Sequence, residues 1–153
     1  MADVIQQIWR LVSSGLTAAW SEENTRESIF SAIKRREVYA TSGTRIKLRF
    51  FGGWEYVESD ISRSDYAVVG YQKGVTMGGD LTRSPGNKSP SFMVAATRDP
   101  DGANLDRIQI IKGWLDARGE TQEQIFDVAL SDGRKANWRG EIPPVGNTVD
   151  GLN

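Results

Sequence analysis

A short acidic segment at 99–106, Asp-Pro-Asp-Gly-Ala-Asn-Leu-Asp, holds the densest group of potential metal ligands in the chain. Hard cations such as Ca²⁺ and Mg²⁺ bind several oxygen atoms, and one loop can supply them. An EF-hand loop, however, needs glycine at its sixth position and an acid at its twelfth, and this segment has neither. Asp-Pro-Asp-Gly is also typical of a β-turn. We expect a turn without metal, and the alternative is a Ca²⁺ or Mg²⁺ site built from Asp99, Asp101 and Asp106.

A second group with possible chemistry is basic, because residues 26–49 carry seven Lys or Arg and two acids. Within 44–51 the cations alternate with apolar side chains, which places them on one face of a predicted strand. Clustered cations can hold phosphate or sulfate. An exposed strand face is normally charged as well, which discourages aggregation through the strand edge. We expect a solvated face, and the alternative is an anion site at Arg35, Arg36, Arg45, Lys47 and Arg49.

Cysteine and histidine are both missing from the 153-residue chain. Their absence excludes disulfides, thiolate chemistry, histidine general bases, the Ser-His-Asp triad and zinc sites built from Cys or His. We therefore expect no cofactor, and only Ca²⁺ or Mg²⁺ stays open. The net charge of −1 and the pI of about 5.5 argue against nucleic acid as a partner.

Two further patterns bear on localisation. No apolar run approaches the roughly 20 residues that a membrane helix needs. The first residues show no basic stretch followed by an apolar one, so no signal peptide is visible. We expect a soluble chain without a membrane partner, and its compartment is not specified by the sequence.

The elements that must position these residues begin with helices. Apolar residues spaced at i, i+1, i+4, i+7 and i+8 predict a helix over 3–14, which Gly15 is placed to end. A short apolar run at 16–20 is consistent with a buried strand. Asn24 with Glu27 three residues later resembles a capping box, which predicts a second helix over 25–37.

From residue 38 the apolar pattern changes to a period of two. Within 44–51 we expect Ile46, Leu48 and Phe50 to face the core and Arg45, Lys47 and Arg49 to face solvent or an anion. Turn-rich segments separate later strand candidates at 54–58, 66–72, 91–97, 107–114 and 124–130.

The predicted fold is α+β. Helices at about 3–14 and 25–37 pack on an antiparallel, β-sandwich-like body at about 38–142. The expected division is a helical segment 1–37 and a β-rich domain 38–153 with an irregular C-terminal tail.

Five separate blocks, in the same order, resemble the C-terminal region of a large bacterial family of unknown function, DUF3604. The resemblance covers about residues 15–150. The blocks are Glu22–Phe30, Arg35–Ile46, Phe50–Trp54, Gly78–Leu81 and Asp99–Trp114.

The resemblance implies that this chain corresponds to one part of a larger protein. Longer members of the family carry an N-terminal barrel that looks like the polymerase and histidinol phosphatase (PHP) type, a metal-dependent phosphoesterase scaffold. The His and Asp ligands of that barrel lie upstream of anything present here, so no metal ligand transfers to this chain. Residues 16–37 would correspond to a last strand–helix unit of the barrel, and 39–43 to the exit into the β-rich region.

Together these observations favour a non-catalytic accessory or structural domain, a fragment of a phosphoesterase-like protein, without enzyme activity in isolation. One alternative is a cation-dependent hydrolase that acts on an anionic substrate. Another is a small-ligand-binding module, because five Trp could line an apolar pocket. Apolar side chains in 1–37 that would face the barrel predict a homo-oligomer, or a contact with a separate PHP-like barrel chain.

Overall fold

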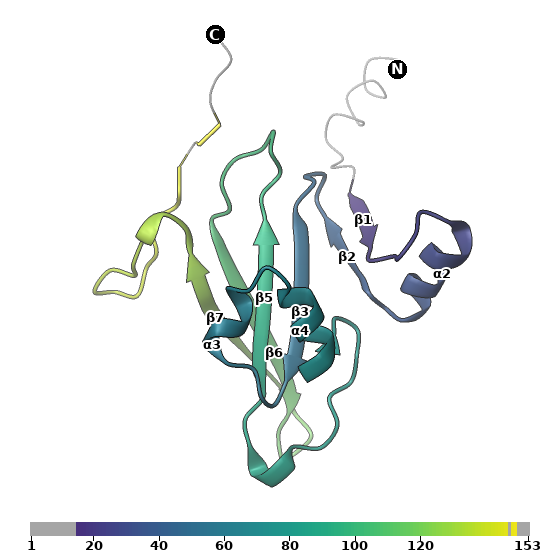
Figure 1. The fold of residues 1–153 in the computed structure, drawn as a ribbon. Helices are drawn as coiled ribbons and strands as arrows, with labels where there is room; N and C mark the ends of the chain where they lie inside the picture. The colour runs from purple at the N-terminus through teal and green to yellow at the C-terminus, as the bar shows by residue number, and fades with distance from the viewer. Residues whose placement is uncertain (1–14, 147, 150–153) are drawn as a thin grey trace, which may run out of the picture. The chain divides into compact units, whose positions relative to one another are not determined.

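A computed structural model describes residues 15–146 and 148–149 (Figure 1). The helix predicted at 3–14 lies outside the described residues. The chain forms two compact units, one ending at Asp99 and one beginning at Pro100. Strands on either side of the expected boundary after residue 37 pair with each other, and the expected division there stays a prediction.

The first part of unit one is a β-hairpin with a helix in its connection. Strand β1 (Leu16–Ala19) pairs antiparallel with β2 (Val38–Thr41), and helix α2 (Arg26–Lys34) lies between them in the sequence. Thr25 caps the helix by accepting a hydrogen bond from the backbone N–H of Ser28 at 3.3 Å. The predicted second helix is therefore confirmed.

Helix α2 ends three residues earlier than predicted because the chain turns into a Schellman motif. The N–H of Glu37 donates to the carbonyl of Ala32 at 3.0 Å, and the N–H of Arg36 donates to Ile33 at 2.9 Å. Arg36 adopts the left-handed conformation, with φ of 63°. This conformation usually belongs to glycine, so the surrounding contacts must hold Arg36 in it.

The rest of unit one is built on a three-stranded antiparallel sheet with strand order β4-β3-β5. Its strands are β4 (Gly74–Thr76), β3 (Lys47–Gly53) and β5 (Ser91–Thr97), and the short 3₁₀ helix η1 (Pro85–Asn87) precedes β5. Strand β5 begins and ends at the predicted residues. Strand β3 begins three residues later than the predicted 44–51 and continues through the two glycines that follow.

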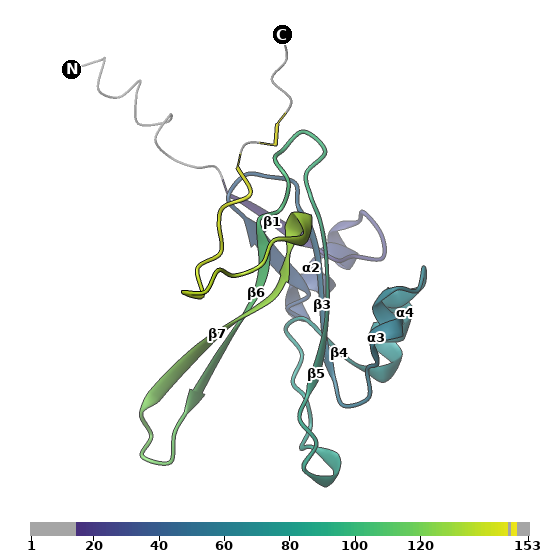
Figure 2. The same ribbon diagram turned by 90° about the vertical axis from the view of Figure 1, so that its left-hand side faces the viewer.

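The strands predicted at 54–58 and 66–72 are wrong, because residues 54–57 form a bend and an irregular segment before helix α3 (Glu58–Ile61), and helix α4 (Tyr66–Lys73) replaces the second strand. Figure 2 shows both helices on one side of the β3–β5 sheet. Segment 66–72 is rich in β-branched and aromatic side chains, which favour strands. Packing overrides that preference here, because Val69 and Gly70 of the helix are buried while Val68 and Tyr71 remain exposed.

The core of unit one centres on Phe51, which has no exposed surface. Its ring meets Tyr71 edge to face at 5.2 Å between centroids. Phe51 shares its strand face with Arg49, so the expectation that the charged face of this strand is the solvent face fails at Arg49 and holds at Lys47. Phe50, on the opposite face, stacks on Phe92 at 5.4 Å.

Unit two contains one long antiparallel hairpin. Strand β6 (Arg107–Leu115) pairs with β7 (Thr121–Leu130), with a register shift between Ile108 and Gln109. The short 3₁₀ helix η2 (Ser131–Gly133) follows. Both predicted strands are confirmed, and β7 begins three residues earlier than expected. The α+β fold class is confirmed by the helices and antiparallel sheets of the described residues. The sandwich-like packing stays a prediction.

Asp60 ties α3 to α4 through a nearly buried ion pair. Its side chain is 7% exposed, and both carboxylate oxygens accept from Lys73 Nζ, at 2.9 and 2.8 Å. The backbone N–H of Val57 donates a further hydrogen bond at 2.9 Å. The hydrogen bond from Lys73, followed by that from Val57, holds the pKa of Asp60 below its ordinary value.

The close approach of α4 to Phe51 predicts that Gly70→Ala destabilises the protein. A Cβ at Gly70 would lie 2.7 Å from the Phe51 ring, so the helix must move away from the sheet at a cost of about 1–3 kcal/mol. Alanine in an open helix position would instead stabilise by about 1 kcal/mol. Urea unfolding measures the difference. Gly113→Ala is the control, because its nearest contact would be 3.9 Å away, and a Gly70→Ala protein as stable as wild type would contradict this packing.

The Asp60–Lys73 pair predicts a contribution to acid sensitivity. Because the folded pKa of Asp60 lies below the unfolded value, its stabilisation is present above about pH 4 and is lost as pH falls through the folded pKa. We expect Asp60→Asn and Lys73→Met each to lower stability at neutral pH and to flatten its decline in acid. Urea unfolding between about pH 7 and pH 2 tests this. Slopes equal to that of wild type would show that the pair is not formed.

Candidate functional site

The most deeply buried charge among the described residues is the carboxylate of Glu37, whose side chain is 3% exposed. The residue joins the end of α2 to the start of β2. Its backbone is held on both sides, because its N–H donates to Ala32 and its carbonyl accepts from the N–H of Trp20 at 3.0 Å. The position of the carboxylate therefore follows directly from the way the helix ends.

Four side chains donate hydrogen bonds to this carboxylate, and they come from different elements. Oε1 accepts from Arg49 Nη1 at 3.1 Å, from Thr76 Oγ1 at 3.2 Å and from the hydroxyl of Tyr71. Oε2 accepts from Arg35 Nη2 at 3.3 Å. A carboxylate offers about four acceptor sites, and four side chains donate to this one, three of them to Oε1 and one to Oε2. We call these five residues the Glu37 cluster.

Arg49 completes the cluster by stacking between aromatic rings. Its guanidinium carbon lies 3.5 Å from the centre of the Trp20 ring and 5.8 Å from that of Tyr71, and its side chain is 16% exposed. Trp20 is itself fixed, because its indole N–H donates to the carbonyl of Leu48 at 2.9 Å. A desolvated cation over a Trp ring gains about 2 kcal/mol. Trp20 thus supports a buried ion pair.

Tyr71 sits between the two charges. Its hydroxyl accepts from Arg49 Nη1 at 2.7 Å and donates to Glu37. Although Tyr71 is 47% exposed as a whole, desolvation of its hydroxyl raises its pKa, and its hydrogen bond to the Glu37 carboxylate raises the pKa further. The tyrosine therefore stays protonated at neutral pH and acts as a hydrogen-bond donor in the cluster.

The cluster contains the residue types of acid–base chemistry, but each is engaged by a neighbour. An anionic ligand would have to displace Glu37 from Arg35 and Arg49, and a cation would have to displace both arginines. Removing one partner of a buried ion pair leaves an uncompensated charge, which costs about 3–5 kcal/mol. The arrangement therefore favours a fixed structural role over ligand exchange.

The five cations predicted as an anion site are only partly brought together. Arg35 and Arg49 meet at Glu37, whereas Arg36 pairs with Asp80 at 3.2 Å on an exposed surface. Arg45 and Lys47 are exposed. The three remaining members of the cluster, Glu37, Tyr71 and Thr76, were missed. Glu37 could have been found as an acid within the basic segment 26–49. Tyr71 was missed because residues 66–72 were predicted as a strand and not as a helix.

The three aspartates of the acidic segment have different surroundings. Asp99 accepts from the N–H of Arg45 at 2.7 Å in unit one. Asp101 and Asp106 belong to unit two. Asp106 accepts from Arg107 Nε at 2.6 Å, from Arg134 Nη1 at 2.8 Å and from the N–H of Val145 at 3.0 Å.

The hydrogen bond from Arg107 is the main cause that lowers the pKa of Asp106. Two guanidinium groups thus supply the positive charge that a cation would bring. Within 15–146 and 148–149, no three acidic side chains are grouped as metal ligands.

The sequence profile of a family described as "Protein of unknown function (DUF3604)" matches residues 2–153. The chain belongs to this family. No curated protein and no solved structure matches it. No helix in the described part has the length and apolar character needed to cross a membrane.

Two of the sequence blocks that resemble DUF3604 meet beside the Glu37 cluster. A Cβ on Gly78 would collide with the backbone and Cβ of Arg36, so only glycine permits this close approach. Gly78 also has φ of 76°, and Asp80 two residues later pairs with Arg36. The contact links the end of α2 to the segment after β4.

The buried Glu37 carboxylate accepts four hydrogen bonds. We therefore predict that Glu37→Gln strongly lowers the stability of the folded protein. The amide keeps the shape of the side chain but removes the charge that Arg35 and Arg49 face, so we expect a loss of at least about 2 kcal/mol. Urea unfolding followed by Trp fluorescence measures it. Asp80→Asn is the matched control, because that carboxylate is 89% exposed and its pair with Arg36 contributes less than about 1 kcal/mol. Equal effects of the two changes would contradict the role of the cluster.

Proposed function

We propose that this chain is a non-catalytic accessory domain of a larger DUF3604 protein. The observation that carries the proposal is the burial and pairing of Glu37, whose side chain is 3% exposed and whose carboxylate accepts from Arg35, Arg49, Tyr71 and Thr76. A general base needs a free lone pair in reach of substrate. The Glu37 carboxylate instead binds donors that lie at the end of α2 and in β3, β4 and α4, and so connects these elements.

The parent protein that we propose is bacterial and carries a PHP-like phosphoesterase barrel upstream. The support is the resemblance of the sequence blocks to the C-terminal region of longer family members and the match of the family profile to residues 2–153. In this arrangement the barrel supplies the metal ligands and the chemistry. The domain described here contributes a folded attachment whose buried carboxylates, Glu37 and Asp60, are internally paired.

The proposal predicts that the isolated chain does not hydrolyse phosphoesters. The measurement is turnover of a panel of phosphomonoesters and phosphodiesters with added Mg²⁺ or Mn²⁺. The expected result is no rate above that of the metal alone. The matched control is a chain with Asp99, Asp101 and Asp106 changed to Asn. Turnover by wild type that the triple variant loses would overturn the proposal and favour a cation-dependent hydrolase.

A further inference from the structure

A rigid turn near the end of unit two presents a tryptophan to solvent. Asn137 closes the turn with its backbone and its side chain. Its N–H donates to the carbonyl of Glu141 at 2.9 Å, and its Oδ1 accepts from the N–H groups of Arg139 at 2.8 Å and Glu141 at 2.9 Å. We call residues 137–141 the Trp138 turn.

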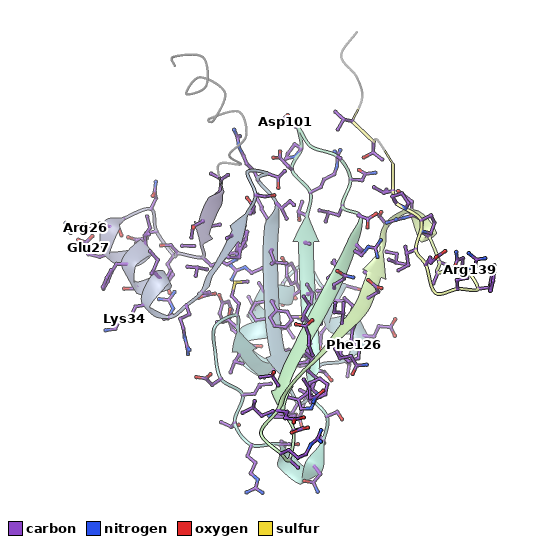
Figure 3. The ribbon with its side chains drawn as sticks, turned by 180° about the vertical axis from the view of Figure 1, so that it is seen from behind. Arg26, Glu27, Lys34, Asp101, Phe126 and Arg139 are labelled. Carbon is purple, nitrogen blue, oxygen red and sulfur yellow. The ribbon has the colours of Figure 1, made fainter. Side chains whose placement is uncertain are left out.

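Trp138 is 86% exposed at this turn. The guanidinium carbon of Arg139 lies 4.5 Å from the centre of its ring, and Figure 3 shows Arg139 at the outer end of the loop. Tryptophan is highly buried on average in folded proteins, and Trp and Arg are the residues most enriched among interface hot spots. A stacked Trp–Arg pair on a preorganised turn loses little conformational entropy on binding.

Unit one carries a depression of about 400 Å³ beside the start of α2. The residues that line it include the apolar Ala19 and Ile29 and the acidic Glu22 and Glu23. Ligand pockets range over roughly 300–1,000 Å³, so this depression has the size for one aromatic side chain with a neighbouring polar group. We call it the Glu22 pocket.

The Glu22 pocket is also preorganised. Ser21 Oγ donates to the carbonyl of Glu23 at 2.6 Å and lies within hydrogen-bond distance of Ser28 Oγ at 2.7 Å, and the N–H of Glu23 donates to Ser28 Oγ at 3.2 Å. These bonds fix the backbone between β1 and α2. Within the described residues neither Glu22 nor Glu23 has an ion-pair partner, so both carboxylates face solvent with their charge uncompensated.

We propose that the Trp138 turn of one copy of the chain inserts into the Glu22 pocket of a second copy. The indole lies against Ala19 and Ile29, and the Arg139 guanidinium faces Glu22 and Glu23. Charge complementarity favours this occupant, because the turn presents the Arg139 guanidinium next to its aromatic ring while the Glu141 carboxylate is held by the Asn137 amide at 2.9 Å, and the pocket presents two acidic residues next to apolar ones. A small anion is repelled by the same carboxylates, and a simple metal ion leaves the apolar residues uncovered.

This contact joins two different surfaces, so it is heterologous. Each copy keeps one free turn and one free pocket after the first contact forms, and association continues until a ring closes or an open chain grows. The proposal therefore predicts a mass that rises with protein concentration. It concerns self-association alone and does not depend on whether the domain is catalytic.

The test uses two variants that each remove one half of the contact. Trp138→Ala removes the inserted ring, and Glu22→Lys combined with Glu23→Lys reverses the charge of the pocket. In sedimentation velocity at micromolar concentrations, wild type is expected to form species above 16.9 kDa, and each variant alone is expected to sediment as a monomer. A loss of at least about 30-fold in affinity corresponds to a hot-spot residue.

Mixing the two variants makes the test decisive. The double-Lys variant keeps its turn and the Trp138→Ala variant keeps its pocket, so an equimolar mixture should form a dimer and nothing larger. Phe126→Ala and Glu27→Lys are matched controls, since Phe126 is 40% exposed and Glu27 lies on α2 and does not line the pocket. Both controls should associate like wild type.

The contradicting results are equally definite. A wild-type chain that stays monomeric at all concentrations overturns the proposal. A mixture that shows no dimer also overturns it, provided that circular dichroism shows both variants folded as wild type. Loss of association in Phe126→Ala with retention in Trp138→Ala would place the interface on the β6–β7 hairpin and would likewise reject the contact.

Discussion

The burial of one negative charge organises the first unit of this protein. The Glu37 carboxylate is stable in the interior only if donors reach it, and those donors come from α2, β3, α4 and β4. Arg36 must adopt a left-handed conformation so that the chain leaves α2 with Glu37 directed inward. Gly78 must lack a side chain so that the segment after β4 can lie against Arg36. Several local features that look unrelated along the chain are thus requirements of the same ion pair.

Two other carboxylates are also paired with cationic side chains. Asp60 is held by Lys73 between α3 and α4, and Asp106 is held by Arg107 and Arg134 beside the β6–β7 hairpin. Pairing of this kind neutralises the charge and orients the elements, and it also removes the carboxylate from chemistry. Among the described residues, the side chains that remain available for interactions are therefore the exposed ones. The uncompensated carboxylates of Glu22 and Glu23 and the exposed ring of Trp138 are of this kind, and they are suited to binding.

The local sequence predicted secondary structure correctly where a single short-range effect determines it. Strand candidates bounded by turn-rich segments placed β5 at Ser91–Thr97 and located β6 and β7, because Gly, Pro, Asn and Asp favour turns between strands. Apolar spacing located α2, although its N-cap is Thr25 and not the expected Asn24. The α+β class followed from these elements. Composition alone excluded histidine and cysteine chemistry, since no fold can supply a missing side chain.

Tertiary structure decided the rest. Segments 54–58 and 66–72 carry strand-favouring residues, yet the second becomes α4 because Gly70 lets a helix approach the ring of Phe51. The alternation in β3 predicted that Arg49 faces solvent, but a buried carboxylate 12 residues away in the sequence and the ring of Trp20 draw it inward. Residues of the Glu37 cluster are separated by up to 41 positions along the chain. Sequence periodicity reports which face of an element is apolar, whereas the partner of a charge is set by contacts between distant segments, and these exist only in the folded chain.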